Sequence, residues 1–549
     1  MNAKNNLISA ILIVLTSFIL VNCTSKQQAD TILIDAKIYT VDSNMNIVEA
    51  MAIYQGKVIA LGSNAEILAH YKSNNIKSIA GEVVFPGFWD AHCHFYGYGI
   101  TQERYADFVG TKSFSEVLNR LKIYRQAHPD QAWILGRGWD QNDWEDQNFP
   151  TKLELDIEYP DVPVLLIRID GHAALANSKA LALAGFNEET VIQGGGLLKN
   201  ESGLTGVLLD NAADFLKAMV PKPDNNLITK SLLKAQNDCF AVGLTSVVDA
   251  GLSFELVQQI DQLQQEGQLK MQVVAMLEPS QKNLDSYVKS GVYQTNLLTV
   301  NSVKLYADGA LGSRGACLLE PYADQLHSHG FLINDPQYYD SICALLYEAG
   351  FQVNTHAIGD SAVRMVLKTY AKYLQGSNDK RWRIEHAQVV NPADFHYFAE
   401  NNIIPAVNTT HATSDMYWAE ERLGAERIKS AYAYKKLLDL NRWCTNGSDF
   451  PIESINPLFG FYAAVARKDH KAYPEDGFQM ENALTREEAL KAMTIWGAKG
   501  SFLEKEKGSL EIGKNADFVI LDQDIMQVAE LEILKTKVLE TFMSGEKVF

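Results

Sequence analysis

The sequence predicts an α/β protein built on a (β/α)8 TIM barrel, with a small composite β-sandwich domain and a large insertion after the first barrel strand. Two patterns indicate this fold. Eight apolar runs with little polar alternation recur between helical stretches, as expected for parallel strands buried on both faces. β-type segments with turn residues occupy both ends of the chain. The 549 residues, 47% of them hydrophobic, suffice for a barrel of about 250 residues and further modules.

The chain begins with a segment typical of export signals. One early Lys4 precedes an apolar run from Leu7 to Val21, which is too short for an ordinary membrane span. The run ends at Cys23 and is followed by polar residues, so residues 1–22 resemble a bacterial lipoprotein signal peptide in which Cys23 is lipidated. We expect an extracytoplasmic protein anchored to a bacterial membrane by this lipid, either facing the periplasm or in the outer membrane. The alternatives are a plain secretory signal and an uncleaved anchor.

The two ends of the remaining chain are expected to meet in one β-sandwich domain. Residues 24–82 alternate short β-type runs with turns, and residues 500–549 repeat this pattern. Residues 83–499 then form the barrel. Its eight expected strands are 83–95, 245–251, 271–277, 303–308, 352–356, 383–386, 403–408 and 443–449, with helical segments such as 255–265, 338–349 and 361–373 between them. The gap after the first strand is too long for a loop, so an inserted subdomain is expected at about 96–240.

Composition excludes several classes of protein. The formal net charge of −18 argues against a nucleic-acid-binding protein, which needs clusters of Lys and Arg to neutralise phosphates. Six cysteines are too few for a disulfide framework in so long a chain. No glycine-rich loop follows a strand in the pattern of nucleotide-binding proteins, so a nucleotide cofactor is not expected.

Metal-ligand side chains recur where the expected barrel strands end. His92 and His94 are two residues apart, so both imidazoles can face the same side of a strand. His356, His386 and Asp449 close three further strands. Functional residues of βα barrels lie at the carboxyl ends of the strands, and this set of ligands suits a borderline metal such as zinc. A single histidine is more often structural, but five such residues at matching positions predict a metal site.

These motifs resemble the amidohydrolase superfamily, specifically its family-3 branch, which includes N-substituted formamide deformylases. The matching segments are 87–94, 170–178, 308–316, 356–360, 383–388, 447–451 and 508–517, so the resemblance covers essentially the whole chain after the signal. It implies a TIM barrel of the metal-dependent hydrolase type and a metal centre with His92, His94, His356, His386 and Asp449 as ligands.

In many relatives a carboxylated lysine at the end of strand four bridges two metals, and Lys304 occupies this position here. An unmodified ammonium group in an apolar strand would be costly and would repel cations, which favours the carbamate. The alternative is that Lys304 reaches water or pairs with a carboxylate, leaving one metal.

The expected reaction uses the metal to lower the pKa of bound water towards about 7 and to polarise a substrate carbonyl. Asp449 could accept the proton of that water and pass it to the leaving nitrogen. The resemblance makes His172 a candidate for binding the carbonyl oxygen, against a structural role in a loop. Arg314, after strand four, could bind a substrate carboxylate or form a surface ion pair.

Several other aromatic and histidine residues have both a functional and a structural interpretation. Trp139 and Trp144 are candidates for walls of the substrate pocket, with core packing the alternative. A second His-x-His pair, His327 and His329, follows no strand and is interpreted as part of a lid or surface loop. His411, near the end of strand seven, is a weaker candidate for the site.

The sequence therefore predicts a metal-dependent amidohydrolase that cleaves a carbon–nitrogen bond other than a peptide bond. The expected substrate is a small amide, N-acyl or N-formyl compound, and the expected cofactor is a divalent metal, with zinc as the first candidate. The rival within enzymes is a metal-dependent isomerase, lyase or ester hydrolase on the same scaffold. A rival of another class is a lipid-anchored binding protein without catalysis, which Asp449 argues against because a binder needs no proton shuttle.

Overall fold

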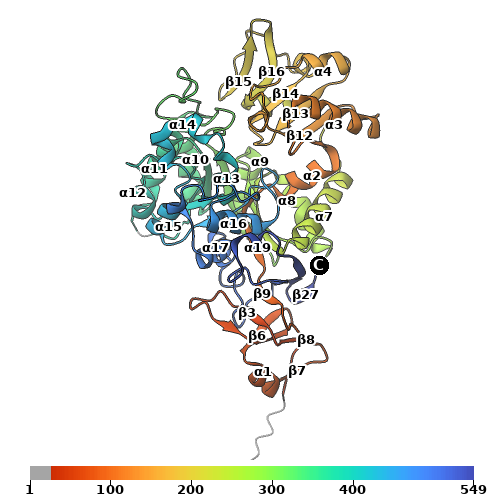
Figure 1. The fold of residues 1–549 in the computed structure, drawn as a ribbon, viewed down its shortest axis with the longest axis vertical. Helices are drawn as coiled ribbons and strands as arrows, with labels where there is room; N and C mark the ends of the chain where they lie inside the picture. The colour runs from red at the N-terminus through yellow and green to blue at the C-terminus, as the bar shows by residue number, and fades with distance from the viewer. Residues whose placement is uncertain (1–25, 377) are drawn as a thin grey trace, which may run out of the picture.

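A parallel barrel of eight strands forms the centre of the computed structural model, which describes residues 26–376 and 378–549 (Figure 1). Its strands follow one another around the sheet in chain order. They are β10 (Phe88–Cys93), β17 (Leu244–Leu252), β18 (Gln272–Leu277), β20 (Leu298–Tyr306), β21 (Gln352–Ala357), β22 (Arg383–His386), β23 (Ile404–Val407) and β24 (Thr445–Asn446). All eight overlap the strands expected from the sequence, and the predicted TIM-type barrel is confirmed.

The ring closes where the last strand meets the first. The backbone N–H of Asp449 donates to the carbonyl of His92 at 2.8 Å, and the backbone N–H of Ser448 donates to the carboxylate of Asp90. Gly447 permits this approach, because a Cβ there would lie 2.4 Å from the backbone nitrogen of His92. The closure therefore places two expected metal ligands, His92 and Asp449, side by side.

Helices follow most barrel strands and cover the outside of the ring (Figure 1). Local signals fix their ends. In α10, Asp335 caps the first turn by accepting from the N–H of Tyr338, Pro336 is the first helical residue, and Gly350 ends the helix in the left-handed region at φ 75°. The helices around the barrel are α8 (Phe254–Gln265), α10 (Pro336–Ala349), α11 (Asp360–Tyr373), α12 (His396–Glu400), α13 (Thr409–Asp415), α14 (Ala419–Arg427), α15 (Tyr434–Asn441), α16 (Pro457–Ala466), α17 (Arg486–Ala492) and α18 (Ile495–Gly500).

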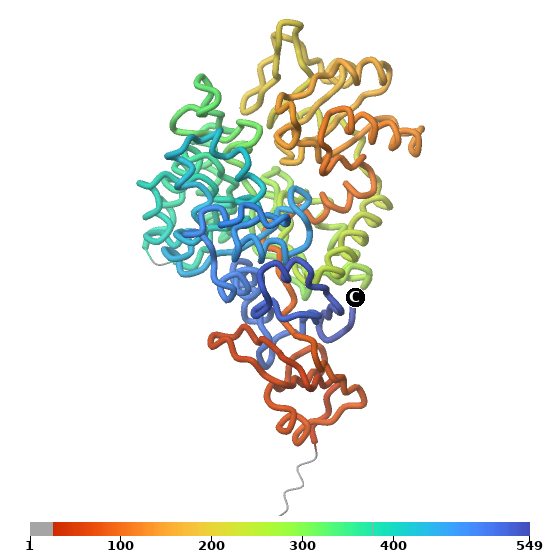
Figure 2. The backbone as a smooth tube through the Cα atoms, in the orientation of Figure 1, coloured from red at the N-terminus to blue at the C-terminus, as the bar shows by residue number. Residues whose placement is uncertain are grey.

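Strands from the two ends of the chain form two larger sheets beneath the barrel, beside a small sheet of β1 (Gln27–Gln28) and β7 (Tyr71–Lys72). The order β6-β5-β2-β8 makes the first sheet, with bounds Lys57–Gly62, Ala50–Tyr54, Thr31–Ile34 and Ile76–Ser78. The order β27-β26-β25-β9-β3-β4 makes the second, with bounds Glu546–Lys547, Val538–Met543, Phe518–Leu521, Val83–Pro86, Lys37–Tyr39 and Ile47–Val48. One apolar cluster, including Leu33, Met51, Val84 and Phe518, draws on both sheets. Figure 2 shows the C-terminal chain in blue beside the N-terminal chain in red and orange.

The first expected strand, 83–95, is in fact two strands in two different sheets. β9 belongs to the sheet at the chain ends, and β10 begins the barrel. The break falls at Gly87, where a Cβ would lie 2.3 Å from the Thr245 side chain, so only glycine fits this crossing. The continuous apolar run concealed the break because both strands are fully buried.

The segment between β10 and β17 forms a separate layered unit over one end of the barrel (Figure 1). Its sheet has the order β11-β12-β13-β14-β16-β15, with bounds Ala106–Asp107, Ile134–Trp139, Val164–Arg168, Ala173–Ala176, Gly203–Asp210 and Gly195–Asn200. Helices α3 (Phe114–Ala127) and α4 (Leu153–Glu158) pack on one face, and α5 (Ser178–Leu183) and α6 (Asn211–Lys217) pack on the other. Helices α2 (Phe95–Arg104) and α7 (Asn225–Ala241) connect this unit to the barrel.

Within residues 26–376 and 378–549, no helix combines the length and the apolar character needed to cross a membrane. The predicted signal peptide and Cys23 lie outside the described residues. The five described cysteines are free thiols, and four of them are buried.

Candidate metal centre and substrate cleft

His92 and His94 are presented by the carboxyl end of β10, where helix α2 begins. Asp249, at the end of the neighbouring strand β17, accepts the N–H groups of Phe95 and Tyr96 and so fixes the start of that helix. The Nε2 atoms of His92 and His94 lie 3.5 and 3.3 Å from Asp449 Oδ1. Three ligand-type side chains from the first and last strands therefore converge on one point.

His356 and His386 bring two more imidazoles to the same place. The ring centroid of His386 lies 4.6 Å from that of His356 and 5.0 Å from that of His92. Its Nδ1 lies 2.9 Å from Asn408 Oδ1, so an Nδ1–H would donate there and leave Nε2 free to bind a cation. Burial lowers the pKa of both His356 and His386 well below the usual value. They are therefore neutral near pH 7, the form that binds metals.

The backbone redirects two of these ligands into the site. Along β22, Ile384 packs in the helix-facing core, whereas Arg383 and Glu385 contact each other and Arg383 donates to the Ala91 carbonyl. Simple alternation would put His386 on the side of Ile384, but its φ of 71° interrupts the strand geometry. Asp449 also has a positive φ, 63°. Strained backbone of this kind concentrates at functional sites.

Glu385 contacts the ring nitrogen of His92 that points away from Asp449. Its Oε2 makes a short contact with His92 Nδ1, and its Oε1 pairs with Arg383 Nε at 2.7 Å. Burial alone would raise the pKa of Glu385, but the charge of Arg383 leads the effects that lower it to about 2. Burial, followed by the charge of Lys304, lowers the pKa of His92 to about 4. Glu385 is therefore ionised and fixes a neutral His92 with Nδ1 protonated and Nε2 open towards the site.

Lys304 reaches the same point from β20. Its Nζ lies 3.0 Å from His92 Nε2, and its side chain is buried. Burial lowers the pKa of Lys304 to about 8, so about a tenth of the amine is neutral at pH 7, far more than for an exposed lysine. Among the described residues, no carboxylate lies within 4.0 Å of this nitrogen.

The donor set fits a divalent cation. The atoms of His92, His94 and Asp449 that can bind a metal lie within 4.8 Å of one another, and those of His386, His411 and Asp449 do so as well. Asp449 Oδ1 and His411 Nε2 are buried without a hydrogen-bond partner, which is costly unless another group satisfies them. Burial alone would raise the pKa of Asp449, but the nearby histidines hold it well below its usual range. This carboxylate is therefore ionised.

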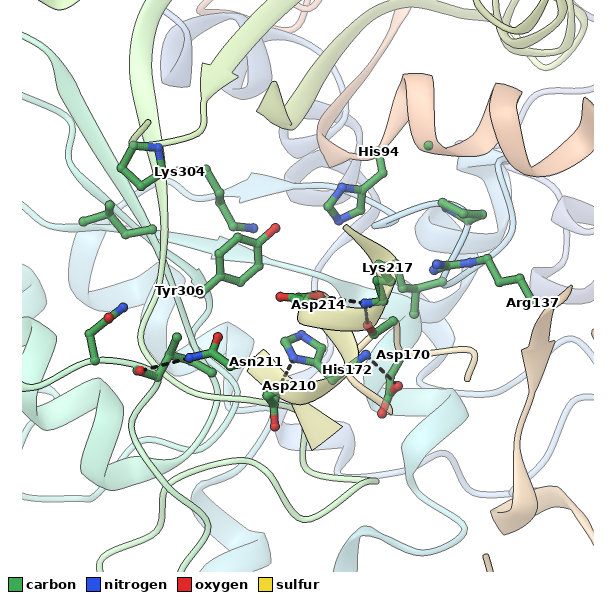
Figure 3. Close-up of a pocket in the computed structure, with 18 of the residues that line it drawn as sticks. His94, Arg137, Asp170, His172, Asp210, Asn211, Asp214, Lys217, Lys304 and Tyr306 are labelled. Carbon is green, nitrogen blue, oxygen red and sulfur yellow. Dashed lines mark hydrogen bonds and ion pairs between the residues drawn. The ribbon is translucent and has the colours of Figure 1, made fainter. Parts of the chain in front are cut away.

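His172, from the inserted unit, faces this cluster across the cleft. It follows a turn at Gly171, and its ring centroid lies 4.8 Å from that of His356. Its Nδ1 lies 2.7 Å from Asp210 Oδ1 (Figure 3). Burial alone would lower the pKa of His172, but the hydrogen bond to Asp210 raises it. The sequence did not single out Asp210, which is 38 residues away in the chain.

A cleft between the barrel and the inserted unit connects these groups. One cavity of about 390 Å³ is lined by His94, His172, Lys304 and Tyr306, together with residues of α6 (Figure 3). A second, of about 1070 Å³, is lined by His356, His386, His411 and Asp449 and by aromatic residues of the barrel rim. Both are lined by Arg137, Asp170, His172, Pro451 and Ile452, so they are two parts of one cleft.

The structure places other predicted site residues away from this cleft. The Trp139 side chain is 1% exposed, packs in the core of the inserted unit and donates to the Leu166 carbonyl, so it cannot form a pocket wall. Trp144 lies in the same core. Arg314 is paired with Asp324 at 2.7 Å and lines neither cavity. In all three cases the side chain contacts a partner that does not line the cleft.

The remaining histidines separate into two groups. His411 lies inside the cleft, where its Nε2 is 3.8 Å from Asp449 Oδ2. Its ring stacks on that of His386, with 5.7 Å between the centroids. This weaker candidate of the sequence analysis is therefore part of the histidine cluster. His327 and His329 lie in the loop after β20, and His329 Nδ1 lies 3.3 Å from the Leu318 carbonyl. Neither of them lines the cleft.

Comparison with known proteins gives consistent matches over most of the chain. Residues 79–549 match the family described as "Amidohydrolase family". The chain is 32% identical to YtcJ of Bacillus subtilis (strain 168), whose name places it among the amidohydrolases, over 93% of this chain and 98% of that protein. It is 26% identical to the N-substituted formamide deformylase of Arthrobacter pascens, over 94% and 98%. A solved metal-dependent hydrolase from Pyrococcus horikoshii is 29% identical and superimposes with a TM-score of 0.74, over 91% of this chain and 99% of that one.

Proposed function

The chain belongs to the amidohydrolase family and is a metal-dependent hydrolase, and from this premise we propose that it cleaves a carbon–nitrogen bond other than a peptide bond. The bond is that of an amide, N-acyl or N-formyl substrate. The proposal rests on the convergence of four histidines, Lys304 and Asp449 at the barrel mouth, beside a buried Asp449 oxygen without a hydrogen-bond partner. The name of the Arthrobacter relative, a formamide deformylase, supports the same bond class.

His92, His94, His386 and Asp449, with His356 beside His386 at 4.6 Å between ring centroids, would hold the divalent cation, which we propose to be zinc because imidazole and carboxylate donors suit it. When bound, the cation would lower the pKa of a water molecule and polarise the substrate carbonyl. Glu385 and Asn408 keep two of the imidazoles in the orientation that binding requires.

Asp449 is assigned the proton transfer. Its carboxylate is ionised, 6% exposed and adjacent to the histidine cluster, so it can accept a proton from the attacking water and deliver it to the leaving nitrogen. Water adds to the acyl carbon, the carbon–nitrogen bond breaks, and the products are a carboxylic acid and an amine. Delivery of the proton matters because an unprotonated nitrogen anion is a very poor leaving group.

His172 is assigned to the carbonyl oxygen of the substrate. It faces His356 across the cleft, and Asp210 fixes its Nδ1, so Nε2–H of the protonated ring would donate to that oxygen as negative charge develops on it. The raised pKa of His172 favours the protonated form.

Lys304 is proposed to be carboxylated and to join two cations. A buried amine whose pKa is lowered to about 8 has the neutral population that reacts with carbon dioxide, and the resulting carbamate would bring negative charge beside His92. Elemental analysis of the purified protein measures the metal content. About two ions per chain are expected, and one tightly bound ion would contradict the two-metal version.

Turnover of a panel of N-formyl and N-acyl amines, with and without added zinc, tests the proposed function. Asp449→Asn should abolish zinc-dependent turnover while leaving the circular dichroism spectrum intact. Asp439→Asn is the control, since Asp439 is an exposed partner of Lys435 on α15. Near-normal activity of Asp449→Asn would refute its role. Metal-dependent turnover of esters alone would point to the rival reaction class, and absence of both metal and turnover would point to a binding protein.

A lipid anchor is proposed for the mature protein from the sequence of its first 23 residues. In this proposal Cys23 carries the lipid, and the enzyme acts outside the cytoplasm on the membrane surface. In its native host the wild-type protein should incorporate labelled fatty acid, and Cys23→Ser should not. Absence of label from the wild type, or label that persists in Cys23→Ser, would contradict the proposal.

A further inference from the structure

Arg137 is a cation of the cleft that forms no ion pair with any described acidic side chain. It lies on β12 of the inserted unit and lines both cavities. Figure 3 shows its guanidinium directed into the smaller cavity, towards His94 and Lys217. In the described part of the chain, the only hydrogen bond of its side chain is a long one, from Nη2 to the Ile169 carbonyl at 3.3 Å. Its Nε is buried without a partner, and no described carboxylate oxygen lies within 4.0 Å of it.

Asp170 and Asp140, two acidic residues that line the cleft together with Arg137, are occupied elsewhere. Asp170 gives one oxygen to Arg168 at 2.6 Å and the other to the backbone N–H groups of His172 and Ala173. Asp140 also pairs with Arg168 and accepts from the N–H of Asn142. One buried arginine thus engages both carboxylates and leaves the neighbouring guanidinium of Arg137 open.

The other cations of the smaller cavity have different partners. Lys217 pairs with Asp214 at 2.9 Å and donates to the Gly171 carbonyl at 2.7 Å. Lys304 contacts His92 at the metal-binding end of the cavity. If Lys304 is a carbamate, Arg137 is the one cationic side chain described for this cavity that has no anionic partner.

We propose that Arg137 binds a carboxylate of the substrate, so that the enzyme acts on anionic amides. This inference rests on the proposed function and specifies its substrate class. A guanidinium offers parallel N–H donors that match the two oxygens of a carboxylate. The cavity of about 390 Å³ holds both Arg137 and His94, so one small molecule can place its carboxylate at the first and its carbonyl near the second.

The sequence favours Arg314 for this role, and the structure favours Arg137. Arg314, in the loop after β20, is already paired with Asp324, whereas Arg137, on β12, has no such partner among the described residues. An arginine that is already neutralised gains little from a second carboxylate.

Two ketones test the proposal without any bond cleavage. 3-Benzoylpropanoate and butyrophenone share a phenyl ketone and a three-carbon chain, differ by a carboxylate in place of a methyl group, and contain no carbon–nitrogen bond. Calorimetry with the zinc-loaded protein should show that the carboxylate compound binds at least tenfold more tightly. Arg137→Gln should remove this preference, and Arg137→Lys should retain part of it because the charge remains.

Arg125→Gln is the matched control, because Arg125 lies in the same inserted unit, is also half-buried and donates only to the carbonyls of His128 and Gln131. It should preserve the preference. Equal binding of the two ketones by the wild-type protein would overturn the proposal. A preference that persists in Arg137→Gln would also overturn it, because the anion would then be held at the metal end.

This outcome is separable from that of the proposed function. A carboxylate preference that depends on Arg137, without hydrolysis of any amide, would support the anion site and refute the reaction. Hydrolysis of neutral amides without any such preference would do the reverse.

Discussion

Glu385→Gln should weaken metal binding although Glu385 is not itself a proposed ligand. The carboxylate has two tasks: Oε2 contacts His92 Nδ1 and lies 2.9 Å from Arg383 Nη2, while Oε1 faces Arg383 Nε at 2.7 Å. Glutamine has one carbonyl oxygen and one amide nitrogen in their place. Either orientation of the amide therefore sets two hydrogen-bond donors against each other in a site that is 0% exposed.

The two orientations have different consequences. With the amide nitrogen towards His92, the ring must carry its proton on Nε2, the atom that faces Lys304 and Asp449, and it can no longer bind a cation. With the nitrogen towards Arg383, the buried Nε of Arg383 loses the ionised oxygen that lies 2.7 Å away and only the contact of Nη2 with the remaining oxygen is kept, at a cost of about 1–3 kcal/mol in the free energy of unfolding. Loss of an outer partner of a metal-bound histidine typically lowers metal affinity by about 10–100-fold, or about 1.4–2.8 kcal/mol.

Competition with a chelator of known zinc affinity measures this loss, with elemental analysis as the readout. Glu400→Gln is the control, since Glu400 is an exposed residue at the end of α12. It should bind zinc like the wild type. Zinc affinity of Glu385→Gln within threefold of the wild type, together with an unchanged free energy of unfolding, would refute the reasoning that Glu385 sets the tautomer of His92.

Three further predictions concern stability. Gly447→Ala should lower the free energy of unfolding by about 1–3 kcal/mol, because its Cβ would lie 2.4 Å from the His92 backbone nitrogen. Gly460→Ala is the control and should leave the free energy of unfolding unchanged, because its Cβ would have no contact closer than 3.4 Å. Equal denaturant midpoints for the two variants would contradict this prediction. Removal of the metal by a chelator should lower the melting temperature, and added zinc should restore it, because a ligand that binds only the folded state stabilises that state. An unchanged melting temperature after verified loss of the metal would contradict this prediction. Burial raises the pKa of Asp249 to about 7, above the unfolded value of about 3.9, so the stability it contributes is complete below about pH 4 and is lost as the pH rises through 7. The melting temperature of Asp249→Asn relative to the wild type should therefore rise from pH 4 to pH 8, and a constant difference would count against this assignment.

The barrel and its ligand-bearing strand ends were predictable because both are local patterns. A strand such as β18, buried throughout, leaves a nearly continuous apolar run, and His356 stands at the last but one position of β21 in the sequence. The pair His92 and His94 is visible from its spacing alone. Such features require no knowledge of which distant segments meet.

The partners of these residues were not predictable, because they depend on contacts between distant segments. Asp210 reaches His172 only after the inserted sheet has folded, and Glu385 meets His92 across 293 residues. The choice between a free and a paired arginine, which separates Arg137 from Arg314, likewise depends on where Asp324 lies. Glu385 did carry one signal, an acidic residue in an otherwise buried strand beside an expected ligand.

Because the chain passes at Gly87 directly from β9 into the first barrel strand, the last 50 residues support the start of the barrel. β25, near the C-terminus, pairs with β9 from Val83 to Pro86, and the next strand carries His92. A chain ending at residue 499 would expose a fully apolar strand edge, which invites aggregation. Domain exchange between homologues must therefore move residues 26–94 together with residues 500–549, because neither end is complete without the other.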